Sequence, residues 1–253
     1  MNSFFRRIRH GLFQNKKFLN YSLYALGEII LVVAGILIAL QINNWNEEKK
    51  EAKSLHTNIL SIKNDLVEDS IIIEEILSTL QKQEQAAKRI IPVLESEDKI
   101  IKDSLEFILD FNELTTTPII IDRNNTWQLL TSNGTLAEFP DPELLDMLNY
   151  YYNRTKELGI NFTNSANPVR LELRKLKYEL FEETEHRKFF PTPNPKVPSK
   201  KVYNAIFEDN RVLPLGRYIG STASYFEKGY EDLLANVNSL IIYISNHYDH
   251  SKQ

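Results

Sequence analysis

Residues 52–90 read AKSLHTNILSIKNDLVEDSIIIEEILSTLQKQEQAAKRI, and this stretch decides the fold. Its apolar side chains recur at alternating steps of three and four residues, the spacing of a heptad repeat on one helix face. No glycine or proline occurs between Trp45 and Pro92, so no residue that breaks helices interrupts this stretch. The positions of this heptad seam are Ala52, Leu55, Ile59, Ile62, Leu66, Ile73, Ile76, Leu80, Ala87 and Ile90, and two further slots hold the polar residues Asp69 and Gln83.

Two arrangements fit such a seam. One is a parallel coiled coil with a second copy of the chain. The other is the buried face of one helix in an antiparallel bundle formed by a single chain. Matching faces later in the sequence favour the bundle, and both arrangements stay open at this point.

The later segments read mostly as helices. We expect helices at 100–111, at 125–133 with a stop at Gly134, from 142, from 168, and at 226–244. Residues 119–121 form a short candidate strand, and the proline-rich residues 189–198 form an extended connector. The sequence therefore predicts an all-α fold whose long, heptad-patterned helices pack as a bundle.

An apolar segment precedes the seam. Residues 23–42 carry only Glu28 and Gln41 as strongly polar side chains. A length of about 20 residues matches a membrane hydrocarbon core of about 30 Å, so we predict a transmembrane helix. A cleaved signal peptide would also begin with basic residues, but no A-x-A cleavage site follows. A buried helix of a soluble protein is the third alternative.

The flanks of this segment predict its orientation. The preceding flank has five basic residues and no acidic one: Arg6, Arg7, Arg9, Lys16 and Lys17. The following flank has both acidic and basic residues. Because basic flanks stay in the cytoplasm, we predict a basic amphipathic cytoplasmic segment at 1–20, a transmembrane helix at 21–43 and an extracytoplasmic (periplasmic) domain at 44–253.

Small residues lie on one face of the predicted transmembrane helix. Gly27, Gly35 and Ala39 follow i+4 spacing, and Glu28 lies beside them. Small residues let another helix approach closely, and a polar side chain adds a hydrogen bond. We therefore predict that this face contacts another transmembrane helix. Glu28 has a second interpretation, as a side chain extending toward the inner leaflet.

Residues 24–47 read YALGEIILVVAGILIALQINNWNE, after FFRRIR at 4–9. This opening resembles an uncharacterised family of single-pass membrane proteins common in Bacteroidota, mainly over the first 50 residues. The resemblance implies an inner (plasma) membrane protein with a periplasmic domain, and it implies no activity.

The composition limits the classes of function that the chain can have. The 253 residues have a formal net charge of −4 and no cysteine, which argues against nucleic-acid binding and excludes disulfides and a cysteine nucleophile. No dinucleotide-binding, P-loop, nucleophile-elbow or zinc-protease motif occurs. We therefore expect no catalysis, no cofactor and no metal.

Three groups of residues are candidate sites. Arg123, Trp127, Tyr150 and Arg154 would suit a pocket for an anionic or sugar-like ligand, and ordinary packing is the alternative. His247 and His250 would form half a metal site, but a frayed tail competes with that interpretation. The third group, which we expect to be a solvated helix face, is Glu182, Glu183, Glu185 and His186.

Three functional classes remain. The first is a membrane-anchored helical interaction or scaffold protein of the cell envelope, which associates with itself or with another envelope membrane protein. The second is a periplasmic ligand-sensing module, which would need a partner because about 20 cytoplasmic residues are too few for an effector domain. The third is an unrecognised envelope enzyme.

Overall fold

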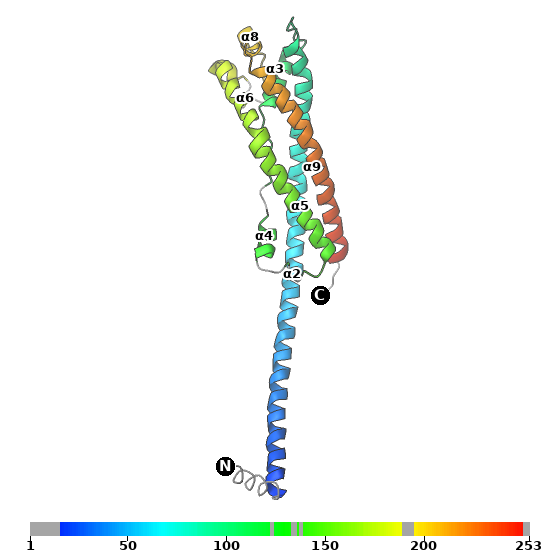
Figure 1. Cartoon of the computed structure of the whole chain (residues 1–253). Coiled ribbons are helices and arrows are strands. Elements are labelled where there is room, and N and C mark those ends of the chain that lie inside the picture. The colour runs from blue at the N-terminus through cyan, green and yellow to red at the C-terminus, as the bar shows by residue number, and fades with distance from the viewer. Residues whose placement is uncertain (1–15, 122–123, 133–135, 137–138, 189–194, 250–253) are drawn as a thin grey trace, which may run out of the picture. The chain divides into compact units, whose positions relative to one another are not determined.

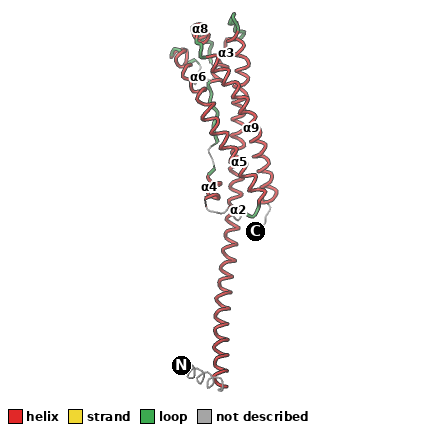
Figure 2. Tube along the Cα trace, in the orientation of Figure 1, coloured by secondary structure: helices red, strands yellow, loops and turns green. Residues whose placement is uncertain are grey.

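The computed structural model describes residues 16–121, 124–132, 136, 139–188 and 195–249. Contacts divide the chain into two compact units, Met1–Thr57 and Asn58–Gln253. The described residues form helices and loops without a strand (Figures 1 and 2). The helices are α2 (Lys16–Glu95), α3 (Ser104–Leu114), α4 (Asn125–Ser132), α5 (Pro142–Asn161), the π-helix η2 (Phe162–Ala166), α6 (Asn167–Leu180), α7 (Glu183–His186), α8 (Lys200–Glu208) and α9 (Val212–Tyr248).

The first unit contains the apolar part of α2. The helix from Asn20 onward includes an 18-residue window with a mean hydropathy of 2.5, and none of that window is buried. By length and composition, this helix can cross a membrane. The all-α class, with a long apolar helix near the N-terminus followed by further helices, is confirmed. The predicted boundary at 43/44 concerns the membrane surface and stays a prediction.

The second unit buries the heptad seam within one chain. Every seam position from Ile59 to Ile90 is at most 2% exposed, and this includes Asp69 and Gln83. The seam meets α5 at Tyr151, α6 at Arg170 and α9 at Gly220. Phe226, Leu233 and Val237 of α9 are buried at heptad spacing as well. Burial inside one chain favours the bundle for this stretch of the seam. Of the two earlier positions, Ala52 is exposed and Leu55 is half-buried.

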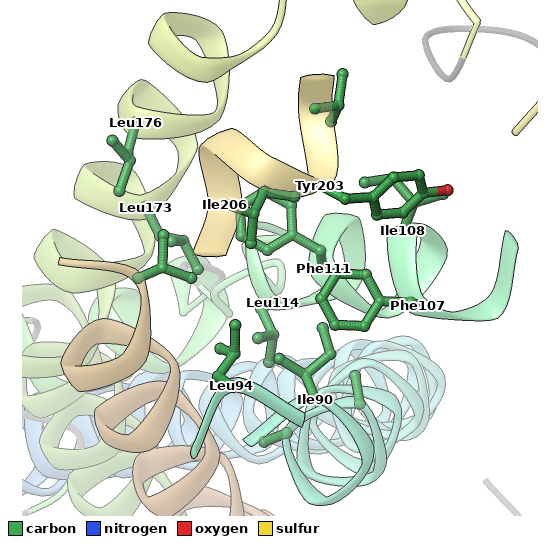
Figure 3. Close-up of a cluster of buried hydrophobic side chains, with 14 of the residues drawn as sticks. Ile90, Leu94, Phe107, Ile108, Phe111, Leu114, Leu173, Leu176, Tyr203 and Ile206 are labelled. Atoms are coloured by element: carbon green, nitrogen blue, oxygen red, sulfur yellow. The ribbon is translucent and has the colours of Figure 1, made fainter. Parts of the chain in front are cut away.

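A second group of apolar side chains closes one end of this unit. Phe107, Phe111 and Leu114 of α3 gather with Ile90 and Leu94 of α2, as Figure 3 shows. Leu173 and Leu176 of α6 and Ile206 of α8 complete the same cluster. The sequence did not predict α8, a nine-residue helix with three buried side chains. Its burial explains why so short a helix is stable.

The start of one predicted helix needs correction. The helix predicted at 100–111 begins at Ser104, because Asp103 caps it by accepting hydrogen bonds from the backbone N–H groups of Leu105 and Glu106. The predicted helix at 125–133 is α4, and its expected stop at Gly134 lies outside the described residues. Residues 119–121 are neither helix nor strand, and Ile121 is buried.

The helices predicted from 142 and from 168 are joined rather than separate. The π-helix η2 connects α5 directly to α6, and the N–H of Asn167 donates to the carbonyl of Phe162. Pro168 has no N–H, so the regular α-helical bond to residue 164 cannot form. A wider π turn is one way in which a helix accommodates such a gap. The predicted connector at 189–198 is non-helical at 195–198, and residues 189–194 lie outside the described residues.

Candidate functional site

Both polar positions of the seam form hydrogen bonds with side chains from other helices. The hydroxyl of Tyr151 on α5 donates to Asp69 Oδ2 at 2.8 Å, and both residues are fully buried. Gln83 Oε1 accepts two hydrogen bonds from Arg170 of α6, both at 3.0 Å. Polar groups inside a core cost several kcal/mol of desolvation unless they are bonded, so these pairs fix which helices face each other.

Arg170 is the centre of a buried polar network. Its side chain is 0% exposed, and its third nitrogen donates to the carbonyl of Ala166 at 3.0 Å and to Thr222 Oγ1 at 3.2 Å. Among the residues that the structure describes, no carboxylate forms an ion pair with it. Burial lowers the pKa of Arg170 to about 10. The charge of Arg170 is therefore stabilised by hydrogen bonds to neutral acceptors on α2, η2 and α9.

Two more cations of α6 point toward the end of α3. Arg174 donates to the carbonyl of Thr115 at 2.9 Å and 2.5 Å, and Lys177 donates to Asn112 Oδ1 at 2.8 Å. The carbonyls at a helix C-terminus carry a partial negative charge, and Arg174 donates to one of them. Lys177 bonds to the side chains of Asn112 and Thr115 at the same helix end. Burial lowers the pKa of Lys177 to about 8. Arg174 and Lys177 thus fix α6 against the end of α3, whereas Arg170, one turn earlier on α6, joins this helix to α2 and α9.

A third contact attaches the short helix α4 to the bundle. The ring of Trp127 stacks on that of Tyr152 at 4.9 Å between centroids and 9° between planes. The hydroxyl of Thr126 donates to Asp65 Oδ2 at 2.7 Å. Stacking between parallel aromatic rings adds about 0.5–1.5 kcal/mol to the burial of the two side chains.

The four predicted pocket residues lie in different surroundings. Arg123 is outside the described residues, and Trp127 packs against Tyr152. Tyr150 is 50% exposed, although Tyr152 on the same helix is buried. Arg154 pairs with Glu157 at 2.9 Å and lies against α9 at Gly229. A pocket formed by these four residues stays a prediction.

The predicted transmembrane contact face is open in the described structure. A Cβ atom built on Gly27 or on Gly35 would meet nothing within 4 Å. Glu28 and Ala39 are exposed as well. Among the described residues, none covers that face, and the contact with another helix stays a prediction.

The structure also describes most residues of the two other predicted groups. Glu183 and His186 lie on the short helix α7, and Glu185 accepts hydrogen bonds from Lys188 and from the N–H of Ser199. His247 does not lie on a frayed tail, because α9 continues to Tyr248 and the His247 ring stacks on Tyr243. His250 lies outside the described residues. Within the described ranges, no cluster of three or more His, Cys, Asp or Glu side chains has metal-binding geometry.

Asp141 holds the end of α9 against the start of α5, and sequence reasoning missed this role. As the N-cap of α5 it accepts a hydrogen bond from the N–H of Leu144 at 3.0 Å. The hydroxyls of Tyr243 and Tyr248 donate to the same carboxylate at 3.1 Å and 2.9 Å. Burial opposes the charge on Asp141, but these hydrogen bonds outweigh it and lower its pKa.

Replacing Asp141 by alanine is expected to lower the free energy of unfolding by about 2 kcal/mol at pH 7, because a helix cap and two further hydrogen bonds are lost. The folded-state pKa is lowered, so the contribution is present above the unfolded pKa of about 3.9 and is lost as the pH falls below it. Urea unfolding of the full chain at pH 7 and at pH 3 measures both effects. Asp141→Asn is the control, since asparagine keeps the cap but cannot titrate. A gap between wild type and D141A that stays constant with pH would contradict this explanation.

Comparison with known proteins gives one match. Residues 28–139 match a family of unknown function, DUF6090. The sequence resemblance was expected mainly over the first 50 residues, and the match reaches well beyond them. It includes α3, α4 and most of α2. No curated protein and no solved structure matches the chain. The polar contacts of α2 with Tyr151 and Arg170 thus join the part that matches DUF6090 to residues beyond it.

Proposed function

We propose that this chain is a single-pass protein of a bacterial inner membrane, and that its helical domain is an interaction or scaffold module on the periplasmic side. The basic N-terminal flank supports this orientation, and the resemblance to single-pass proteins of Bacteroidota supports the location. In this proposal the chain has no catalytic role and associates with itself or with another envelope membrane protein.

One contrast carries the proposal. The domain uses its own heptad seam to close its core, whereas none of the described residues buries the apolar window of the helix in the first unit. Lipid covers apolar side chains, but it does not match the shape of a groove formed by glycine and alanine. Gly27, Gly35 and Ala39 would gain dispersion contacts from a second helix that approaches closely.

Replacing Gly35 and Ala39 together by isoleucine is expected to reduce association of the chain in membranes about fivefold to tenfold, without preventing insertion. Both changes raise hydrophobicity but fill the groove that a partner helix would enter. Quantitative crosslinking of the full-length protein in isolated membranes measures the effect, with identification of any second protein that is captured.

The matched control is Val33→Ile with Leu37→Ile, which has the same spacing on the opposite side of the helix. Equal crosslinking of wild type and both double variants would show that the small-residue face does not mediate association. Loss with both pairs would point to a general sensitivity of the transmembrane helix to β-branched substitutions instead.

A ligand-sensing role is the second candidate. It is favoured by a surface cavity between α2 and α9 that is lined by basic and hydroxyl side chains.

A further inference from the structure

A groove of about 590 Å³ lies between α2 and α9 on the surface of the second unit. Ala87, Ile91, Pro92 and Gly220 form its floor, and this volume lies within the range of small-molecule sites. The remaining residues of the groove are polar or aromatic and come from both helices: Glu84, Lys88, Ser221, Ser224, Tyr225 and Lys228. None of them belongs to the buried network around Arg170.

The close approach of the two helices brings both sets of side chains together. A Cβ atom on Gly220 would lie 2.5 Å from Cβ of Ala87, so only glycine allows this crossing. Next to it, Pro92 lacks an N–H and cannot donate the usual helical bond to the carbonyl of Lys88. The close crossing of α2 and α9 at Ala87 and Gly220 thus brings the polar residues of both helices to one groove.

The polar side of the groove already holds an anion, which belongs to the chain itself. The Glu84 carboxylate accepts from Lys88 Nζ at 2.8 Å, and Ser224 hydrogen-bonds to it as well. Lys228 of α9 lies close enough to stabilise the same charge. Two ammonium groups, one from each helix, thus converge on one carboxylate, and their combined charge exceeds that of Glu84.

Tyr225 supplies an aromatic surface beside this charged position. Its side chain is 66% exposed, although it lies next to the fully packed Phe226. An exposed aromatic ring can stack on the apolar C–H face of a pyranose, while the sugar hydroxyls bond to groups such as Ser221. An apolar ligand would cover the lysines and serines without bonding to them, and a cation would be repelled by the two lysines.

We propose that this groove binds a small anionic saccharide, a sugar that carries a carboxylate or a phosphate. The anion lies between Lys88 and Lys228, and the sugar ring rests on Tyr225 and the floor. This proposal goes beyond the interaction function and does not depend on association of the transmembrane helices. Glu84 competes with the ligand for the same two cations.

The test is isothermal titration calorimetry of the full chain in detergent micelles with four probes: glucuronate, glucose 6-phosphate, glucose and inorganic phosphate. We expect saturable binding of glucuronate, of glucose 6-phosphate, or of both. Lys228→Met is expected to weaken it about tenfold, because a charge-assisted hydrogen bond is lost. Glu84→Gln is expected to strengthen it about threefold, because the competing charge is removed. Lys175→Met, which changes an exposed lysine of α6 outside the groove, is the control.

Several results would overturn the proposal. The proposal is wrong if neither glucuronate nor glucose 6-phosphate binds saturably. It is also wrong if wild type and Lys228→Met bind them with equal affinity. Glucose binding as tightly as glucuronate would remove the role of the anion. Phosphate binding as tightly as glucose 6-phosphate would remove the role of the sugar. These substitutions lie outside the transmembrane face, so the crosslinking experiment and this titration can fail independently.

Discussion

Replacing Arg170 by alanine is expected to lower the free energy of unfolding of the helical domain by about 3–5 kcal/mol. The substitution leaves a cavity at the position of one of the largest fully buried side chains. It also removes both donors from Gln83 Oε1 and one from the carbonyl of Ala166. Urea unfolding of the full chain in micelles, followed by the helical circular dichroism signal, measures the loss.

Arg217→Ala is the matched control for Arg170→Ala. Arg217 pairs with Glu95 at 2.7 Å, but both side chains are largely exposed, and exposed ion pairs contribute little. The single variant Arg170→Met should lose less stability than Arg170→Ala, because methionine fills much of the space. It keeps the hydrogen bond from Gln83 Nε2 to the carbonyl of Thr116. A loss below about 1 kcal/mol for Arg170→Ala would mean that the network is not important for stability.

Replacing Gly220 by valine is expected to cost about 3 kcal/mol, because the crossing of α2 and α9 has no space for a side chain. The added Cβ would be 2.5 Å from that of Ala87, and both atoms are attached directly to helical backbone. Relief therefore requires separation of the two helices rather than rotation of a side chain. Thermal unfolding of the full chain reports the change as a lower Tm.

Gly216→Ala tests whether loss of glycine alone explains the Gly220→Val result. A Cβ at Gly216 would be 3.8 Å from Leu114 Cδ1, an ordinary contact, one turn earlier on the same helix. Alanine favours helix over glycine, so this variant is expected to be more stable by about 0.5–1 kcal/mol. Destabilisation of similar size at both positions would argue against a specific crossing at Gly220.

The sequence predicted the seam well because periodicity records which face of a helix is buried. Every predicted position from Ile59 to Ile90 is in the core, and so are the predicted positions of α9. The polar slots at Asp69 and Gln83 were visible as exceptions to the pattern. Their partners, Tyr151 and Arg170, lie 82 and 87 residues away in the chain, and no local pattern relates such distant positions.

The candidate sites were harder to predict than the core, because a site depends on how surface side chains from separate helices converge. Tyr150 and Trp127 were grouped by residue type, yet one side chain is exposed and the other is buried. Conversely, Lys88 and Lys228 were not singled out, since isolated lysines on helices are usually solvated. Gly220 brings their two helices together at a tight crossing. A pattern along the sequence does not reveal such a crossing.

The π turn at Phe162–Ala166 is the place where the joined helices α5 and α6 can lose a residue. In a regular helix each residue advances the direction of the side chains by about 100° around the axis, so a single deletion rotates everything after it by about a quarter turn. A π turn holds one residue more than an α turn, so losing one residue here would leave a regular turn with nearly the same angular advance. Arg174 and Lys177 would then keep their direction toward the end of α3, whereas the same deletion within α5 would turn both away from it.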